Sequence, residues 1–311
     1  MKYKMVVLDV DGTLLTNEKT VTARTRATLI RVQQMGIKVV LASGRPTYGV
    51  VGLAKELELD KNGGYILSYN GGQIINVQTN ELLFEKRIDP EFIPYLERKA
   101  QKNGFAIFTY REDEMLTNDA SNERVLQEAR LNGMQLRETD RFSEEVSFHP
   151  WKVMLSSDDE KALVGLEEHW KKRLAGTLDV FRSETYFLEV VPQFIDKANT
   201  LSVLLEKLNI PSADIVAIGD GVCDVTMIQL AGLGIAMGNA QDSVKACADV
   251  ITLSNEEDGV AVALEKAILA DIRPTDIPLD RLNAAGKHAL MGNLGIQYTY
   301  ASEGRIEATM P

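Results

Sequence analysis

The sequence predicts an α/β protein in which a parallel sheet has helices on both faces and an α+β domain is inserted into the core. Three observations support this fold class. An apolar run ends at two carboxylates in Asp9-Val10-Asp11-Gly12. Strand and helix patterns alternate over the first eighty residues. The same alternation returns near Phe187, after about a hundred residues of a different pattern.

The first half of the core is expected over residues 1–82. Met5–Leu8 is typical of a buried strand, and Thr22 is a suitable N-cap for a helix that continues to Met35 and stops at Gly36. Four elements should follow, namely a strand over Ile37–Leu41, a helix from Pro46 to about Leu59, a strand over Tyr65–Tyr69 and, after the turn Asn70-Gly71-Gly72, a strand over Gln73–Val77. Strands separated by helices pair in parallel through right-handed crossovers.

The pattern changes over residues 83–186. Helices are expected after Pro90, Asp119 and Asp158, and strands over Phe105–Tyr110, Trp151–Ser156 and Leu178–Arg182. This segment has no glycine-rich phosphate loop and no acidic pair at a strand end. We therefore expect it to form an inserted α+β domain that acts as a lid.

The second half of the core is expected over residues 187–270. Its elements should be strands over Phe187–Val191, Ile215–Ile218 and Leu233–Met237, with helices from Asp196 to Leu208 and from Asp258 to Leu269. The core would then be discontinuous, because both ends of the chain contribute to one sheet.

Residues 271–311 do not continue this pattern. After a proline-containing linker, Leu279–Leu294 has apolar residues at helical spacing, and Gln297–Tyr300 and Arg305–Met310 indicate two strands joined by a turn. A lone hairpin is marginally stable in water. This tail is therefore expected to dock on another surface or to move.

Composition narrows the functional classes. The formal net charge of −11 argues against nonspecific nucleic-acid binding, which needs a basic surface. No stretch approaches the roughly 20 apolar residues that span a bilayer, so no membrane partner is expected. The N-terminus leads directly into a strand rather than a cleavable leader, and the two cysteines, Cys223 and Cys247, form no CxxC pair. We expect a cytoplasmic protein.

Polar residues gather where the predicted core strands end and one core helix begins. They are Asp9, Asp11, Ser43-Gly44-Arg45, Lys197, Asp220 and Asp224. All should face one edge of the sheet, where open α/β sheets bind ligands. This set suits phosphoryl transfer, because a carboxylate can attack phosphorus, carboxylates can bind a divalent cation, and a lysine can neutralise developing charge.

Each feature alone has a plainer explanation. The DxDG run often marks a turn or a calcium loop, Ser-Gly-Arg commonly caps a helix, a helical lysine is usually solvated, and Gly-Asp-Gly is usually a tight turn. Their order, each after a buried strand or at a helix start, favours the catalytic interpretation of the set.

These residues resemble the haloacid dehalogenase (HAD) superfamily, and specifically its Cof-type phosphatases with a large α+β cap of the C2 type. The matching segments are Asp9–Leu15, Leu41–Pro46, Asn70-Gly71, Asp196-Lys197, Gly219–Asp224 and Ala236–Ala240. The resemblance covers nearly all of residues 1–270. It implies a Rossmann-like core and a magnesium-dependent phosphatase for small phosphorylated metabolites, such as sugar phosphates or the phosphorylated cofactors FMN and pyridoxal phosphate.

The resemblance also implies residue roles. Asp9 would be the nucleophile that forms an aspartyl-phosphate, and Asp11 the acid/base that gives the metal only its backbone carbonyl. The metal set would be Asp9, Asp11, Asp220 and Asp224, with Mg²⁺ as the cofactor. The residues expected to bind substrate or phosphate are Ser43, Gly44, Arg45, Asn70, Lys197 and Cys223.

Two positions depart from the family pattern. Cys223 stands where the family usually has Asn, and a thiol is a much weaker hydrogen-bonding group than an amide. Either the enzyme is slowed or altered, or Cys223 simply packs. Ala198 replaces a usual glycine, a mild change in a helix. Two alternatives to the phosphatase are a phosphomutase, which uses the same nucleophile, and a binding or regulatory protein in which Cys223 marks a weakened site.

The tail has a separate resemblance. His288–Ile296 and Ala308–Pro311 are similar to the opening of a hotdog-fold acyl-CoA thioesterase. Only the first helix and hairpin of that fold would be present, without its catalytic acid, so no thioesterase activity is expected. The tail would serve either for self-association or as the start of a fused thioesterase domain.

Overall fold

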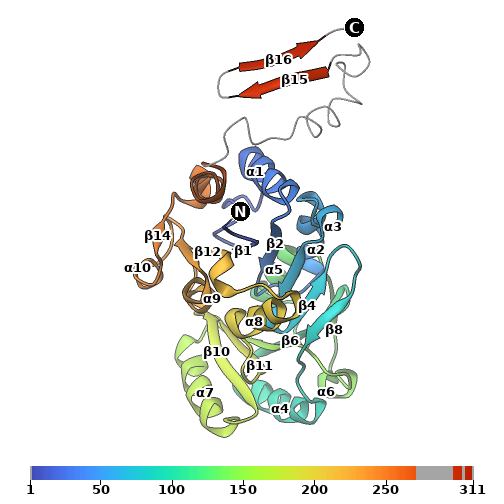
Figure 1. Ribbon diagram of the computed structural model, residues 1–311. Helices are drawn as coiled ribbons and strands as arrows, with labels where there is room; N and C mark the ends of the chain where they lie inside the picture. Colours follow the sequence, from blue (N-terminus) through green and yellow to red (C-terminus); the bar gives the residue numbers. More distant parts are fainter. Residues whose placement is uncertain (1, 271–296, 303–304, 310–311) are drawn as a thin grey trace. The chain divides into compact units, whose positions relative to one another are not determined.

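The computed structural model describes residues 2–270, 297–302 and 305–309 (Figure 1). The chain divides into two compact units, residues 1–260 and 261–311. None of the helices in the described part of the chain has the length and apolar character needed to cross a membrane.

The first sheet has eight strands in the order β14-β13-β12-β1-β2-β3-β4-β5. Their bounds are β1 (Met5–Asp9), β2 (Lys38–Ala42), β3 (Tyr65–Ser68), β4 (Gln73–Asn76), β5 (Leu82–Glu85), β12 (Ile215–Gly219), β13 (Leu233–Ala236) and β14 (Val250–Ile251). The six strands from β14 to β3 pair in parallel, which confirms the predicted parallel core. The turn at Asn70 instead leads into β4 and β5, which add an antiparallel edge.

Helices connect these strands as the pattern predicts. They are α1 (Ala23–Gln34), α2 (Tyr48–Glu56), α3 (Leu59–Asn62), α8 (Lys197–Leu208), α9 (Val225–Leu230), α10 (Asp242–Lys245) and α11 (Gly259–Leu264), the last continued by a wider turn over Glu265–Leu269. Thr22 caps α1 as expected, because its side chain accepts a hydrogen bond from the N–H of Thr25. The helix expected over 46–59 is broken into α2 and α3, because Glu58 adopts a left-handed conformation with φ of 61°.

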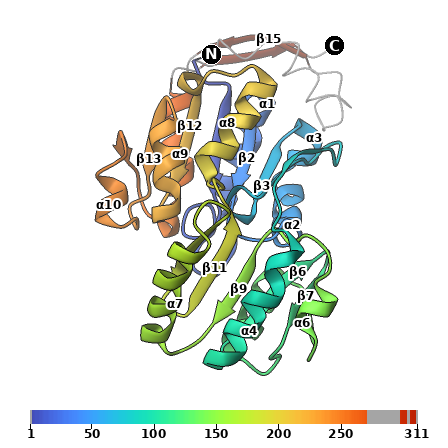
Figure 2. The ribbon, with the colours of Figure 1, turned by 90° about the horizontal axis from the view of Figure 1, so that it is seen from below.

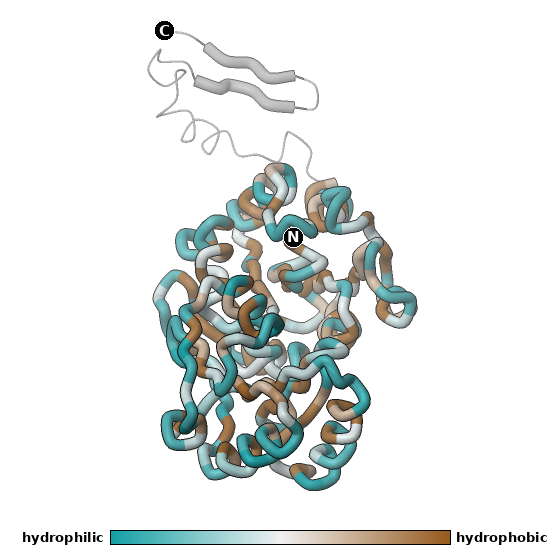
Figure 3. Tube along the Cα trace, turned by 180° about the vertical axis from the view of Figure 1, so that it is seen from behind, coloured by the Kyte–Doolittle hydropathy of each residue, from teal (hydrophilic) through white to brown (hydrophobic). Residues whose placement is uncertain are grey.

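Helices α8 and α9 cover one face of the first sheet (Figure 2). Buried side chains of α8, including Leu201 and Leu204, pack on Val7, Val40 and Ala217 of the central strands. Burial of such side chains is the main source of stability in this layer. Figure 3 shows that hydrophilic residues lie mainly on the outward faces of the helices.

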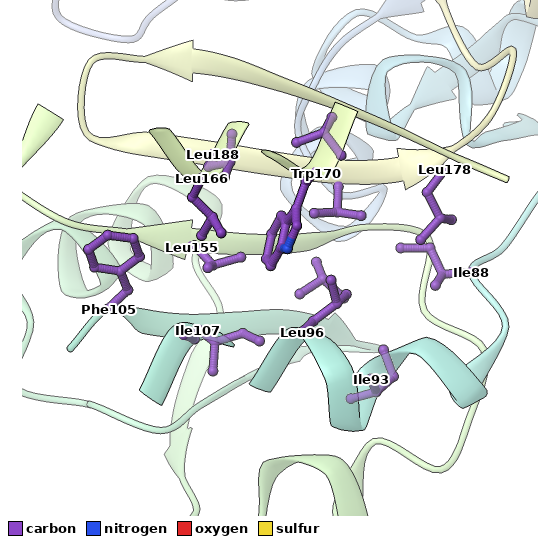
Figure 4. Packing of buried hydrophobic residues seen from close by; sticks show 14 of the residues in the cluster. Ile88, Ile93, Leu96, Phe105, Ile107, Leu155, Leu166, Trp170, Leu178 and Leu188 are labelled. Atoms are coloured by element: carbon purple, nitrogen blue, oxygen red, sulfur yellow. The ribbon is translucent and has the colours of Figure 1, made fainter. Parts of the chain in front are cut away.

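The second sheet has the order β10-β11-β9-β6-β7-β8. Its strands are β6 (Ala106–Arg111), β7 (Glu114–Thr117), β8 (Gln135–Glu138), β9 (Val153–Ser156), β10 (Leu178–Glu184) and β11 (Phe187–Pro192), and its helices are α4 (Ile93–Asn103), α5 (Glu123–Asn132), α6 (Phe142–Glu145) and α7 (Glu160–Arg173). We call residues 86–192, which contain these elements, the cap. Trp170 of α7 is fully buried against Leu96, Leu155 and Leu188 (Figure 4).

One expected strand lies in a different sheet from the one predicted. Phe187–Val191 was expected to reopen the core, but β11 pairs antiparallel with β10 and β9 in the cap. At the other border, β5 extends the first sheet to Glu85, beyond the expected limit at 82. An apolar run shows that a strand is buried but not which sheet buries it.

In the tail, β15 (Gln297–Ser302) and β16 (Arg305–Thr309) form an antiparallel pair, which confirms the predicted hairpin. The helix expected over 279–294 lies outside the described residues. The thioesterase resemblance of the tail stays a prediction.

Candidate active site

The site is centred on a buried lysine between two carboxylates. Asp9 ends the central strand β1, and Lys197 is the first residue of α8 after the N-cap Asp196. The Nζ of Lys197 lies 2.6 Å from Asp9 Oδ1 and 2.5 Å from Asp224 Oδ1. Because Lys197 is 1% exposed, both contacts lie away from bulk water. Residues nearly 190 positions apart are thereby joined in one charged cluster.

The loop after β12 positions the second pair of acids. Asp224 ends the short turn η4 (Val222–Asp224), and its Oδ2 accepts hydrogen bonds from the N–H groups of Asp220 and Gly221 at 3.1 and 2.9 Å. Thr13 Oγ1 donates to Asp220 Oδ1 at 2.7 Å. With Lys197 on its other oxygen, Asp224 mainly orders the lysine and the loop, while Asp220 interacts with the Thr13 hydroxyl and with the Asp9 carboxyl.

Gly12 is required by this arrangement. Its φ of +82° lies in the region that favours glycine, and an added Cβ would lie 2.4 Å from Asp220 Oδ2. The turn after β1 therefore brings the backbone directly against the Asp220 carboxylate. A larger residue here would displace the acid.

The acids can hold a divalent cation. One carboxylate oxygen from each of Asp9, Asp220 and Asp224 lies within 4.8 Å of the others. Hard oxygen donors of this kind suit Mg²⁺. The donor set therefore fits the magnesium that the sequence predicts.

Burial perturbs the charged groups. Burial, with the negative charge of Asp224, raises the pKa of Asp9 well above its ordinary value, although Lys197 opposes this. Burial alone would lower the pKa of Lys197, but the charges of Asp224 and Asp9 outweigh it and raise that pKa well above the usual value. The lysine is therefore charged at neutral pH, and a further cation beside Asp9 would favour its carboxylate form.

Asp11 points to different partners from Asp9. Its two oxygens accept hydrogen bonds from Arg45 Nε and Nη2, both at 2.6 Å, and Lys19 Nζ lies 2.8 Å from Oδ1. Burial raises the pKa of Asp11, but the hydrogen bonds and charges of Arg45 and Lys19 outweigh it and lower the pKa below its ordinary value. In this arrangement Asp11 is a carboxylate held in its charged form.

The loop after β2 lies beside Asp11. Ser43 is buried, and its Oγ accepts a hydrogen bond from the Arg45 N–H at 3.1 Å. A Cβ on Gly44 would lie 3.0 Å from Asn70 Oδ1, so the Ser43–Arg45 loop and the Asn70 turn are in close contact. Two cap groups also contact this loop, since Lys152 Nζ donates to the Gly44 carbonyl at 3.1 Å and the Leu131 carbonyl accepts from Arg45 Nη1 at 3.2 Å.

A cavity of about 600 Å³ opens beside the lysine, between cap and core. Lys197, Cys223 and Asn70 line it together with cap residues of α7 and β10. Cys223 is exposed, which contradicts the alternative that it packs in the core. The protein atoms around its thiol nevertheless displace enough water to raise its pKa to about 12, although Lys197 opposes the shift. Cys223 therefore faces the cavity as a neutral thiol.

The structure brings the predicted site residues to one edge of the first sheet in two adjoining groups. Asp9, Lys197, Asp220 and Asp224 form the metal-side group, and Asp11 with Arg45 forms the other. The sequence interpretation gave no role to three contacting residues, Thr13, Lys19 and Lys152. Thr13 lies within the first motif and was quoted with it, whereas nothing in the sequence distinguishes Lys19 or Lys152 from solvated lysines.

Comparisons with known proteins agree with this geometry. A family model for haloacid dehalogenase-like hydrolases matches residues 6–264. A crystal structure of a haloacid dehalogenase-like hydrolase from Bacteroides thetaiotaomicron is 49% identical, has a TM-score of 0.82, and covers 85% of this chain and 99% of that one. "Putative phosphatase YxeH" of Bacillus subtilis is 31% identical over 271 residues, 86% of this chain and 99% of that protein. The 5-amino-6-(5-phospho-D-ribitylamino)uracil phosphatase YcsE of the same organism is 29% identical over 86% of this chain and 96% of its own length.

Proposed function

The chain belongs to the haloacid dehalogenase-like hydrolases and is a phosphatase of that family, and from this premise we propose that it hydrolyses small phosphate monoesters with Mg²⁺ through an aspartyl-phosphate on Asp9. The observation that best supports the proposal is the contact of Lys197 with both Asp9 and Asp224 inside a group of three acids. A buried cation next to a carboxylate nucleophile and a hard-cation site is what phosphoryl transfer requires.

In the first step, an Asp9 oxygen attacks the phosphorus of the bound ester. A bond forms between that oxygen and phosphorus, and the bond from phosphorus to the alcohol oxygen breaks. Lys197, already beside Asp9, neutralises charge that develops on the transferring group. Asp11 in its protonated form gives a proton to the leaving oxygen.

In the second step, Asp11 takes a proton from water, and the resulting hydroxide attacks phosphorus and releases inorganic phosphate and the Asp9 carboxylate. The lowered pKa keeps Asp11 unprotonated, as the second step needs, although it also makes the carboxylate a weaker base. The acid role requires it to be protonated, so Arg45 or Lys19 must loosen its contact before the first step. This order uses one carboxyl group as acid and then as base.

The metal would be held by Asp9 and Asp220, with Asp224 in the same group and the Asp11 backbone carbonyl as a further ligand. When bound, Mg²⁺ offsets the repulsion between the phosphate and the carboxylates and polarises the phosphoryl oxygens. Ser43, Gly44 and Asn70 would position the phosphate from the neighbouring loop.

The substrate class is proposed from the cavity and from the relatives. A cavity of about 600 Å³ suits a small metabolite rather than a polymer. The relative YcsE acts, by its name, on a phosphorylated ribitylaminouracil. Phosphorylated sugars and cofactors are therefore the esters to assay.

The proposal is tested by measuring phosphate release from p-nitrophenyl phosphate with Mg²⁺ and with EDTA, for the natural chain and for Asp9→Asn. We expect Mg²⁺-dependent release that Asp9→Asn abolishes with an unchanged circular dichroism spectrum. Asp249→Asn serves as a control, because Asp249 accepts from the Gly234 N–H away from the acids that form the site. Full activity of Asp9→Asn would refute the nucleophile assignment.

A further inference from the structure

An aromatic side chain stands beside the cavity in a backbone conformation that aromatic residues rarely adopt. The φ of Phe194 is 63°, in the left-handed region that favours glycine. The residue is also 69% exposed, so burial of the ring in the protein does not explain why phenylalanine is there. Strain of this kind persists where the surroundings enforce it, and it concentrates at ligand sites.

Hydrogen bonds on both sides fix this backbone. The N–H of Phe194 donates to Asp179 Oδ2 at 2.9 Å, and the N–H of Gln193 donates to the Thr177 carbonyl at 3.2 Å. From the other side, Lys86 Nζ donates to the Gln193 carbonyl at 2.6 Å. The segment then reaches Lys197 three residues later. The ring is thus attached to a pinned backbone close to the phosphoryl site.

Both polar and apolar side chains line the cavity. Phe194 and Lys197 both line it, so the ring shares a cavity with the lysine that contacts Asp9. Phe181 and Val222 add apolar surface, and Val222 is 61% exposed. A sugar without an attached ring would bring only hydroxyl groups against these apolar side chains, where they lose hydrogen bonds to water. A flat ring would instead bury apolar area and stack on Phe194.

We propose that Phe194 is a specificity-determining residue that stacks on a planar aromatic or heteroaromatic ring carried by the leaving group, so that the enzyme prefers phosphate esters whose alcohol part carries such a ring to sugar phosphates. This inference rests on the proposed function, because the stacked ring belongs to the alcohol side of the ester. Lys86 Nζ lies 5.6 Å from the centroid of the Phe194 ring, which places a positive charge beside the same surface.

The test compares kcat/KM for FMN and for glucose 6-phosphate in the natural chain, Phe194→Leu and Phe194→Gly. We expect the natural chain to prefer FMN. Phe194→Leu keeps apolar bulk without the ring, and we expect the ratio of the two kcat/KM values to fall by up to about tenfold, the order of one lost stacking contact. Phe194→Gly should lower the ratio at least as far and also raise the thermal midpoint, because glycine relieves the strain.

Tyr48→Leu is the matched control, since Tyr48 is an exposed aromatic residue on α2 that does not line the cavity. It should leave the ratio unchanged. A natural chain that prefers glucose 6-phosphate, or an equal effect of Phe194→Leu on both esters, would overturn the inference while leaving the phosphatase proposal intact.

Binding of riboflavin, followed by the anisotropy of its fluorescence, gives a readout that is independent of turnover. We expect the natural chain to raise the anisotropy and Phe194→Gly to bind riboflavin more weakly. Binding that Phe194→Gly weakens, without phosphate release from any ester, would support the stacking site and refute the phosphatase proposal. If the natural chain neither binds riboflavin nor releases phosphate, both the stacking site and the phosphatase proposal are overturned.

Discussion

Replacing Lys197 with methionine should destabilise the metal-free protein strongly. The lysine is 1% exposed and contacts Asp9 and Asp224 at 2.6 and 2.5 Å. Removing one partner of a buried ion pair leaves an uncompensated charge and typically costs about 3–5 kcal/mol. At about 2–4 °C per kcal/mol for a chain of this size, the thermal midpoint should fall by about 6–20 °C.

The loss of thermal stability in Lys197→Met should also depend on pH. Without the lysine, the already raised pKa of Asp9 rises further, so the folded variant binds a proton that the unfolded chain releases at its ordinary pKa. A group whose pKa is raised on folding stabilises the protein at low pH and loses that contribution as pH rises. The difference in midpoint between Lys197→Met and the natural chain should therefore be smaller at pH 5 than at pH 8.

The assay is thermal unfolding in EDTA, monitored by circular dichroism. Lys61→Met is the matched control, because Lys61 pairs with Glu58 at 3.2 Å on the surface and is 64% exposed. Such exposed pairs contribute about 0–1 kcal/mol. If Lys197→Met lowers the midpoint no more than Lys61→Met does, the reasoning about the buried cluster is refuted.

Three further predictions concern other contacts. Gly12→Ala should weaken Mg²⁺ activation and lower kcat/KM at least about tenfold, because the added Cβ would lie 2.4 Å from Asp220 Oδ2. An unchanged Mg²⁺ titration would contradict this prediction. Lys152→Met should lower the free energy of unfolding in urea by about 3–5 kcal/mol, because it leaves the buried Glu189 unpaired. Adding Glu189→Gln should recover part of this loss, and no recovery would exclude the ion pair as its cause. Burial raises the pKa of Glu167, but hydrogen bonds from Lys171 and Arg182 outweigh it and lower that pKa, so Glu167→Gln should be less stable than the natural chain at pH 7. The difference should disappear as the pH falls below the lowered pKa, and a difference that persists in acid would count against this explanation.

Local signals predicted much of the fold. Thr22 and Asp196 are residues that favour helix N-caps, and both cap helices that begin where the sequence indicated. The Asp9 and Asp220 strand ends were predicted because buried parallel strands are apolar runs that stop abruptly at polar residues. These features depend on a few neighbouring residues.

The features that the sequence did not predict depend on residues that are far apart in the chain. The strand over 187–191 is buried in either sheet, so its apolar run could not show that it pairs with β10 and β9. The pairing of Asp11 with Arg45 and Lys19 depends on side-chain positions that no spacing rule gives. Phe194 was missed because its significance lies in its backbone conformation and exposure rather than in a motif.

The account depends most directly on the covalent step at Asp9. The decisive measurement is a rapid acid quench of the Mg²⁺-loaded chain with ³²P-labelled substrate, followed by mass spectrometry of the labelled peptide. We expect a transient, hydroxylamine-sensitive phosphoryl group on Asp9 whose rate of decay matches turnover. Phosphate release at full rate with the label on another residue, or with no labelled peptide at any time point, would contradict the account.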